Sequence, residues 1–256
     1  MLDILRIPIT KANLLKMSPA ERSLFLLLGY ASNQVNALWK LVIIATNSTN
    51  RNPIEERVSG AQTQILVRLL IGVMREALKL VEKRFLGSVV GKEYVPLLDA
   101  KASAALDRLK KRFSGPDMLV VIRDNFAFHH PTMEDMEAAF QQAILNQDDE
   151  AENWCIYMTP ALLNAFFFVS DFVLVHGMAN ALNESDVNEA HRKLLGELAP
   201  LANDLSEFTF GFAAAIFRKH FGGELTATVV AKIADVPNID DVKLPFFVET
   251  PTLTNE

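Results

Sequence analysis

The segment VVIRDNFAFHHP, residues 120–131, carries the residues of this chain that are best suited to chemistry on a phosphate. It places an arginine, two polar residues and a pair of histidines at the end of an apolar helix that a proline stops. The guanidinium of Arg123 offers a fixed fork of N–H donors to a phosphate. A histidine that titrates near neutrality can take the proton of a ribose 2′-hydroxyl or return one to a leaving oxygen. These residue types together suit the cleavage of a phosphodiester beside a ribose hydroxyl.

The spacing leaves open which histidine would act. Arg123 and His130 are seven positions apart, so an ideal helix puts them on one face, two turns apart. His129 lies about 120° from that face. It reaches the face only where the helix loosens, which the approach to Pro131 favours. A structural interpretation of the same residues also stands: Arg123 pairs with a carboxylate of a neighbouring helix, and the histidines cap the helix C-terminus.

This segment resembles the HEPN superfamily of all-α proteins, whose signature is an arginine and a histidine with four to six residues between them. Arg123 and His129 have five residues between them, Arg123 and His130 have six, and Asp124 matches the polar position after the arginine. IRDNFAFHH is also similar to the I-R-N-x-F-A-F-H segment of a bacterial group related to abortive-infection proteins. In that group the histidine after Phe is the motif residue, which favours His129.

The resemblance implies a metal-independent endoribonuclease of a toxin or phage-defence system, acting as a homodimer whose two motif helices form one composite cleft. In such enzymes the histidine is the acid/base group and the arginine holds the scissile phosphate. The polar residue after it, here Asp124, orients the site, and the product ends in a 2′,3′-cyclic phosphate. Any antitoxin partner would be separately encoded. Some HEPN proteins are catalytically silent, so a helical dimerisation and interaction module is the alternative hypothesis.

Two further groups of polar residues are candidates for contacts with RNA. A basic run just before the motif helix could clamp phosphates, and two asparagines of the first long helix could line a cleft with the motif. The basic run comprises Arg108, Lys110, Lys111 and Arg112, and the asparagines are Asn33 and Asn36. The alternatives are a solvated helix end that complements the helix dipole and plain surface positions. The net charge of −6 argues against a protein that coats nucleic acid.

Other kinds of site are not indicated by the sequence. The single cysteine, Cys155, excludes an internal disulfide and any metal site built on a cysteine cluster. Asp171 and His176 are five positions apart and point to different faces of a helix. No His-Glu-x-x-His motif and no glycine-rich phosphate loop occurs. We therefore expect neither a metal site nor a cofactor.

The elements that must position these residues are long helices, and capping patterns in the sequence indicate where they begin. Ser18-Pro19-Ala20-Glu21 reads as a helix cap, a first-turn proline and a glutamate that bonds back to the cap. Asn52-Pro53-Ile54-Glu55 repeats this pattern, and Thr159-Pro160 is read as a further start. We expect helices over residues 19–46, 53–86, 95–112, 116–130, 133–146, 160–182 and 186–221, the last kinked or broken at Pro200.

These elements predict an all-α fold, an up-and-down bundle of long helices with an irregular C-terminal arm. We expect a HEPN-like bundle over residues 1–222 and an extended arm over residues 223–256 that packs on the bundle or on a partner. Strand patterns are confined to the C-terminus, where residues 225–230 read as a strand or as a helix extension. The apolar share of 50% exceeds what one bundle needs and supports a homodimer.

The only stretch long enough to cross a membrane, residues 155–182, is interrupted by Asn164, Asp171 and His176. A carboxylate in mid-bilayer costs a few kcal/mol on insertion scales, so we expect a buried helix there and no membrane association. The N-terminus does not read as a secretory signal. Together with the single cysteine, these features predict a cytoplasmic protein.

Overall fold

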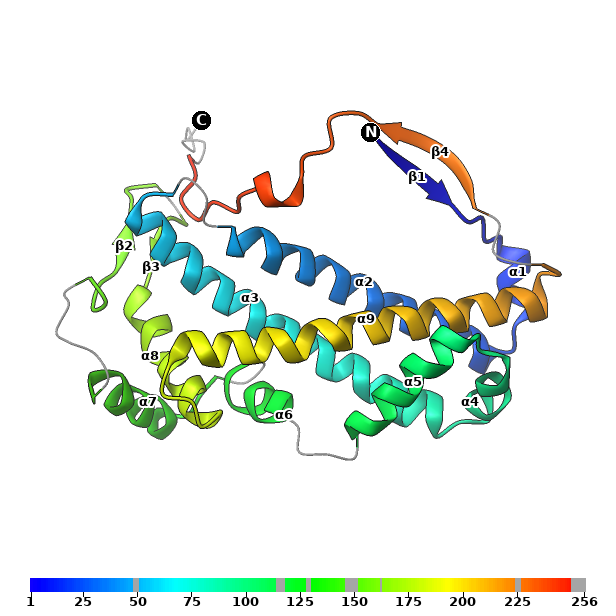
Figure 1. Cartoon of the computed structure of the whole chain (residues 1–256), viewed down its shortest axis with the longest axis horizontal. Coiled ribbons are helices and arrows are strands. Elements are labelled where there is room, and N and C mark those ends of the chain that lie inside the picture. Colours follow the sequence, from blue (N-terminus) through cyan, green and yellow to red (C-terminus); the bar gives the residue numbers. More distant parts are fainter. Residues whose placement is uncertain are drawn as a thin grey trace, which may run out of the picture. The chain divides into compact units, whose positions relative to one another are not determined.

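The computed structural model describes residues 1–47, 51–113, 118–127, 130–145, 152–161, 163–223 and 227–249. Helices make up most of these residues, and within them the strands form only two small two-stranded sheets. The predicted all-α class is therefore confirmed. Figure 1 shows the helices and the two strand pairs, coloured along the sequence from blue at the N-terminus to red at the C-terminus.

The helical elements begin and end as follows: α1 (Lys11–Lys16), α2 (Pro19–Thr46), α3 (Pro53–Lys79), η1 (Leu80–Leu86), α4 (Val89–Tyr94), η2 (Val95–Leu97), α5 (Ala100–Phe113), α6 (Met118–Ile122), η3 (Arg123–Ala127), α7 (Met133–Leu145), α8 (Phe168–Ala181), α9 (Val187–His220) and η4 (Ile239–Asp241). Of these, η1 and η3 are π-helical, and η2 and η4 are 3₁₀ turns. The strands are β1 (Leu2–Arg6), β2 (Tyr157–Met158), β3 (Ala165–Phe166) and β4 (Thr228–Ile233).

The chain divides into two compact units. The first is formed by residues 1–37, 73–117 and 197–238, and the second by residues 38–72, 118–196 and 239–256. The predicted boundary between a bundle over 1–222 and an arm over 223–256 stays a prediction.

The helix starts read from the sequence are confirmed where a capping box is present. The Ser18 N–H donates to Glu21 Oε2 at 2.7 Å, and α2 spans the expected residues 19–46. The Asn52 N–H donates to Glu55 Oε2 at 3.1 Å at the start of α3. Reciprocal bonds inside such a box satisfy backbone donors that the first turn leaves free. The expected helix over 53–86 is α-helical to Lys79 and π-helical beyond it.

Two helix boundaries were predicted wrongly. The expected helix over 95–112 is instead a 3₁₀ turn over Val95–Leu97 followed by α5, whose first turn is capped by Asp99 Oδ1 accepting from Ala102 N–H at 2.8 Å. The expected helix over 160–182 starts only at Phe168, because the residues before it form the antiparallel β2–β3 pair. Helix α9 continues through Pro200, so the chain is not broken there, and buried leucines, Leu198 and Leu201, lie on both sides of the proline. A kink at Pro200 stays a prediction.

A strand at the N-terminus was not predicted. Strand β1 pairs antiparallel with β4, and a register shift occurs between Ile4 and Leu5. Figure 1 shows the two strands side by side. The partners are far apart in sequence: the Thr228 hydroxyl lies 222 positions from the Arg6 carbonyl to which it donates. Within the range 225–230, the part from Thr228 onward is therefore a strand and not a helix extension, and residues 225–226 lie outside the described residues.

The core of the first unit is aromatic. Four large side chains with almost no exposed surface, Phe85, Tyr94, Phe208 and Phe212, form one cluster, in which Phe85 and Tyr94 meet the α9 rings edge-to-face. The ring centroids of Phe85 and Phe208 are 4.8 Å apart, and those of Tyr94 and Phe212 are 5.1 Å apart. Such pairs add about 0.5–1.5 kcal/mol each to the burial of their surface. These contacts tie η1 and α4 to α9.

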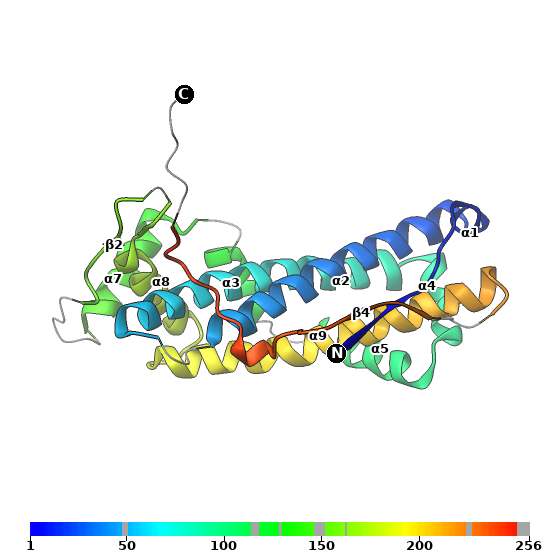
Figure 2. The ribbon, with the colours of Figure 1, turned by 90° about the horizontal axis from the view of Figure 1, so that it is seen from above.

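In the second unit the C-terminal segment 239–249 is held against the helices by side chains. The Asn47 amide donates to the carbonyls of Asp240 and Val242, the latter at 3.2 Å. The Asn164 amide donates to the Val248 carbonyl at 2.5 Å and accepts from the Val248 N–H at 3.1 Å. Figure 2 follows this segment across the first turns of α3. Across the described ranges, no helix combines the length and the apolar character that a membrane span requires.

Candidate functional site

The motif arginine lies at the point where α6 changes its winding. Leu119 and Ile122 of α6 are completely buried and fix this helix in the second unit. From Arg123 to Ala127 the chain continues as the π-helical turn η3. A π-helical turn is wider than an α-helical one and is frequent at functional sites. The winding of the helix therefore widens from α-helical to π-helical at the motif arginine, before Pro131 is reached.

Arg123 and Asp124 form an ion pair within this turn. Nη1 of Arg123 lies 2.6 Å from Oδ1 of Asp124. The aspartate side chain is 46% exposed and faces solvent, whereas the arginine side chain is 22% exposed and mostly covered. Asp124, the next residue in η3, is thus one partner of Arg123. The alternative pairing of Arg123 with a carboxylate of a neighbouring helix stays a prediction.

The two motif histidines differ in what the structure describes. His130 is exposed and follows η3 directly before Pro131. His129 lies outside the described residues, as do residues 116–117 at the start of the helix expected over 116–130. The choice between the two histidines therefore stays a prediction.

Helix α8 supports the motif turn through a glycine. A side-chain carbon built on Gly177 would lie 3.5 Å from Cε1 of Phe126 in η3 and 2.8 Å from Cβ of Ala139 in α7. The second distance is shorter than any ordinary carbon contact. Only a residue without a side chain fits at this place, and the close approach of α7 and α8 positions Phe126 and with it η3.

The basic run is largely paired with carboxylates of the first unit. Arg108 Nη2 lies 2.7 Å from Asp204 Oδ1 and 3.3 Å from Glu207 Oε2. Hydrogen bonds to these two carboxylates raise the pKa of the Arg108 guanidinium. Arg112 pairs with Glu197 at 2.6 Å. The run thus binds helix α5 to α9.

The other residues proposed for RNA contacts are placed on the surface. Lys110 pairs with Asp107 at 2.9 Å, one helical turn away, and Lys111 is exposed. Asn33 and Asn36 are exposed on α2. All of these residues belong to the first unit, whereas Arg123, Asp124 and His130 belong to the second.

Sequence reasoning missed a buried carboxylate cluster in the first unit. Glu21 Oε1 accepts hydrogen bonds from Tyr94 Oη at 2.7 Å, Lys219 Nζ at 2.6 Å and His220 Nε2 at 3.0 Å. Burial alone would raise the pKa of Glu21, but these bonds outweigh it and hold the pKa far below its usual range. Glu21 was read only as part of a helix cap, and nothing local in the sequence points to its distant donors.

The second unit holds a largely buried ion pair, one buried histidine and one partly buried histidine. Arg68 Nη2 lies 2.6 Å from Asp171 Oδ1, with both side chains mostly buried. Nδ1 of His176 lies 2.8 Å from the Phe172 carbonyl, so His176 is a hydrogen-bonded core histidine. His191 Nδ1 lies 2.9 Å from Gln64 Nε2, and burial lowers the pKa of His191. In the described ranges, no group of three or more potential ligand side chains is arranged to hold a metal ion.

Comparison with known proteins finds no matching family model, no matching curated protein and no matching solved structure. What the candidate site can do therefore follows from the chemistry of its own residues and from the motif in which they stand.

Proposed function

We propose that this chain is a metal-independent endoribonuclease of a toxin or phage-defence type, and that Arg123, Asp124 and the histidine pair form its active site. One observation carries the proposal. An arginine and an aspartate pair at 2.6 Å in a partly exposed π-helical turn, and two histidines follow this turn closely in the sequence.

The ion pair suits an arginine that must receive a phosphate. The Asp124 side chain is nearly half exposed, and an ion pair with an exposed partner stabilises a protein by about 0–1 kcal/mol. The contact with Asp124 is therefore given up at little cost when that N–H group of Arg123 turns to a phosphate oxygen. A bidentate bond from a guanidinium to a phosphate is stronger than an ordinary hydrogen bond and fixes orientation. Asp124 holds the guanidinium in place until the substrate arrives.

The reaction needs one acid/base group and one charge-stabilising donor. The histidine takes the proton of the ribose 2′-hydroxyl, and the 2′-oxygen attacks the phosphorus held by Arg123. The bond to the 5′-oxygen breaks, that oxygen receives a proton, and the product ends in a 2′,3′-cyclic phosphate. A positioned acid/base group supplies about 10²–10⁴ in rate and a donor to the developing charge about 10²–10³. These factors suit a slow, regulated nuclease.

A homodimer, a cytoplasmic location and a separately encoded antitoxin belong to this proposal. In a dimer, two copies of the turn at Arg123 would face one another and form a single cleft. The C-terminal arm over residues 223–256 would then pack on the bundle or on the partner copy.

A catalytically silent interaction module is the second candidate, and the pairing of the basic run favours it. Arg108 and Arg112 already bind carboxylates of α9. Phosphate contacts normally supply much of the affinity for RNA, and these two side chains would have to leave their partners to make them.

The deciding experiment incubates the purified chain with a 5′-labelled single-stranded RNA in EDTA. We expect cleavage with a 2′,3′-cyclic phosphate end, detected by mass spectrometry. His129→Ala and Arg123→Ala should abolish cleavage with little change in Tm, because both residues serve the reaction and not the core. His130→Ala decides between the two histidines.

The matched control is Lys92→Ala, a change of an exposed residue of α4 in the first unit. It should leave cleavage unchanged. Cleavage that survives in both histidine variants, or that requires a divalent metal, would refute the proposal. A dimer in light scattering that cleaves no RNA would instead support the silent module.

A further inference from the structure

A polar pocket lies in the second unit, where the chain passes from α8 to α9 beside α7. Two adjoining depressions of about 380 Å³ and 360 Å³ form it, and both are lined by His176 and Ser185. The first depression is lined mainly by polar side chains, and the second adds apolar ones. All of these residues belong to the second unit.

A buried histidine forms the floor of this pocket. His176 is only 5% exposed, and its Nδ1 lies 2.8 Å from the carbonyl oxygen of Phe172. Because a carbonyl can only accept a hydrogen bond, Nδ1 carries the proton, and Nε2 of the uncharged ring is an acceptor. No described residue donates a hydrogen bond to Nε2. With Nδ1 directed at the helix backbone, Nε2 is the atom that accepts an N–H or O–H from a molecule in the pocket.

Three side-chain amides stand around the histidine. Gln142 comes from α7, Asn180 from α8, and Asn183 from the turn that follows α8. Each amide presents both an acceptor oxygen and N–H donors. Within the described ranges, none of these three side chains has a hydrogen-bond partner. A ligand in the pocket therefore meets donors and acceptors that are not already engaged.

The pocket is built for an uncharged ligand. Two carboxylates line it, and both are engaged: Glu184 Oε1 lies 2.7 Å from Lys193 Nζ, and Asp186 Oδ1 accepts from the Asn188 N–H at 2.8 Å. Asp186 caps the start of α9, where the helix dipole is positive and favours its charge. Among the described residues, no lysine or arginine lines either depression. A phosphate would find no cation in this lining.

Apolar side chains provide surfaces for a flat molecule. Phe172, Val175 and Val187 line the second depression. The ring of Phe172 is held by Trp154 and His176, with centroids 5.3 Å and 4.7 Å away. A nucleobase has apolar faces and a hydrogen-bonding edge, and proteins recognise it through both. A sugar carries hydroxyl groups around its whole ring, and those beside the two valines would lack partners.

The side-chain types select among the bases. Arginine and lysine pair best with guanine, aspartate and glutamate with cytosine, and asparagine and glutamine with adenine, through N6 and N7. This pocket has no cation in its described lining, its carboxylates are engaged, and its three amides are available. Adenine also carries a second N6 hydrogen, which Nε2 of His176 can accept.

We propose that this pocket binds an adenine base, with the ring against Phe172 and Val175 and the N6 amino group donating to His176 Nε2 and to the Asn180 amide. The pocket adjoins the motif turn, since a carbon built on Gly177, the next residue, would lie 3.5 Å from Phe126 of η3. The base is therefore assigned to the RNA substrate. This assignment rests on the proposed nuclease function, whereas the binding of adenine does not.

The test is isothermal titration calorimetry of the full chain with adenosine, inosine and ribose, none of which carries a phosphate. Adenosine should bind at one site. Inosine, which has a carbonyl in place of the N6 amino group, and ribose should bind at least about tenfold more weakly. Asn180→Ala and His176→Phe should each weaken adenosine binding by at least about tenfold. Asn203→Ala, a change of an exposed asparagine of α9 in the first unit, is the matched control and should bind adenosine like the unaltered chain.

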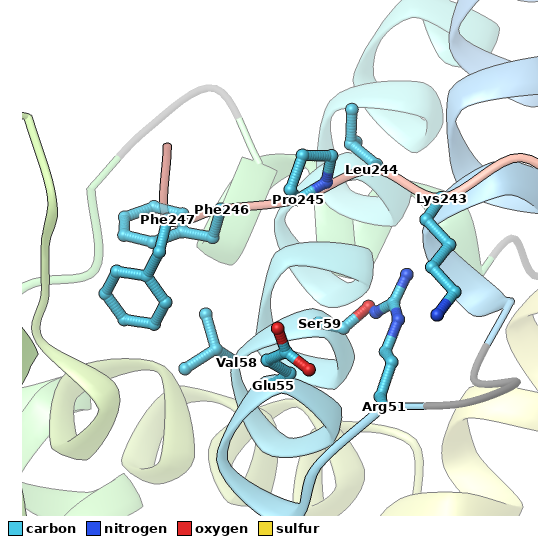
Figure 3. A pocket seen from close by; sticks show the side chains of 9 residues that line it. All are labelled: Arg51, Glu55, Val58, Ser59, Lys243, Leu244, Pro245, Phe246 and Phe247. Atoms are coloured by element: carbon cyan, nitrogen blue, oxygen red, sulfur yellow. The ribbon is translucent and has the colours of Figure 1, made fainter. Parts of the chain in front are cut away.

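A second control concerns another cavity of the same unit. It holds about 160 Å³ between the C-terminal segment and the first turns of α3, and charged side chains of Arg51, Glu55 and Lys243 line it (Figure 3). Lys243→Gln should bind adenosine like the unaltered chain. Weaker binding in Lys243→Gln, with no loss in Asn180→Ala, would place adenosine in that cavity and overturn the proposal.

Asn180 is exposed, so Asn180→Ala is expected to fold even where His176→Phe does not. The proposal is wrong if adenosine does not bind, if inosine binds as tightly, or if Asn180→Ala leaves the affinity unchanged. An RNA arm tests the source of the base. A uridine strand with one adenosine should be cut next to that adenosine, and Asn180→Ala should lose this preference while it still cleaves. Cleavage without the preference would overturn the RNA source, whereas adenosine binding without any cleavage would support the pocket and refute the nuclease.

Discussion

Tyr94 donates a hydrogen bond across 2.7 Å to Oε1 of Glu21, a residue 73 positions earlier in the chain. The same oxygen accepts from Lys219 at 2.6 Å and from His220 at 3.0 Å. The carboxylate is 4% exposed. A single buried oxygen thus joins the first turn of α2 to the end of α4 and to the last turn of α9.

Replacing Glu21 with glutamine should destabilise the protein by about 2–3 kcal/mol, in the upper range for hydrogen bonds to charged groups. The amide cannot carry the charge that Lys219 and His220 face, and it presents donors where the neighbours also donate. Urea unfolding followed by circular dichroism measures the change. Glu93→Gln is the matched control, because Glu93 pairs with Lys219 but is 47% exposed. It should cost less than 1 kcal/mol. Equal losses in the two variants would show that burial of Glu21 has no role.

The contribution of Glu21 should disappear in acid. Its pKa in the folded protein lies far below the ordinary value of 4.5, because the hydrogen bonds outweigh the opposing effect of burial. The unfolded chain therefore takes up a proton first as the pH falls. The stabilisation is fully present above about pH 4.5 and is lost progressively below it. Each unit of separation between the folded and unfolded pKa corresponds to about 1.4 kcal/mol.

Urea titrations of the unaltered chain and of Glu21→Gln at pH 7, 5, 4 and 3 test this dependence. The difference in unfolding free energy should be constant from pH 7 to pH 5 and should shrink at pH 4 and pH 3. The groups that face the carboxylate, Tyr94, Lys219 and His220, are kept in both proteins. A difference that stays constant down to pH 3 would contradict the assignment.

The buried pair of Arg68 and Asp171 predicts a different pattern of losses. Asp171→Ala leaves the Arg68 guanidinium buried without its counter-ion, since the two side chains are only 10% and 16% exposed. This variant should lose about 3–5 kcal/mol. The double variant Arg68→Met with Asp171→Leu should recover most of the loss, because apolar side chains replace a buried pair at little cost. Additive losses in the double variant, measured by urea unfolding, would exclude a direct pair.

The parts of the fold that could be predicted from the sequence are those that local contacts determine. The capping boxes at Ser18, Asn52 and Thr132 each close within four residues, and the helices that follow them begin where expected. Hydrogen bonds of this kind are fixed by residue type and spacing alone.

The parts that were missed depend on partners far away in the chain. In the apolar stretch before Phe168, the spacing of the apolar residues does not distinguish the strands β2 and β3 from the helix α8 that follows. The strands form only because β2 and β3 pair with one another. Strand β1 needs β4, and the C-terminal segment 239–249 is held by Asn47, which lies 193 positions before Asp240. The candidate site could be predicted only in part. The residue types and their spacing predicted the motif, but the π-helical turn at Arg123 depends on how α6 packs.

The close approach of α7 and α8 gives the last prediction, which joins stability to the candidate site. Gly177→Ala would bring a methyl group within 2.8 Å of Ala139 Cβ, and neither helix can relieve this contact by turning a flexible side chain. We expect a loss of about 1–3 kcal/mol, the usual cost of overpacking. Gly60→Ala is the matched control, since nothing lies within 4 Å of the added carbon.

Gly60→Ala should instead stabilise α3 by about 0.5–1 kcal/mol, because alanine loses less backbone entropy than glycine in a helix. Thermal unfolding of the two variants should therefore shift in opposite directions. The two should also differ in RNA cleavage. The added methyl of Gly177→Ala lies 3.5 Å from Phe126, so a shift of α8 moves the turn that carries Arg123, and cleavage should fall even at temperatures where the variant is fully folded. Unchanged cleavage in Gly177→Ala would show that α8 does not position the motif turn.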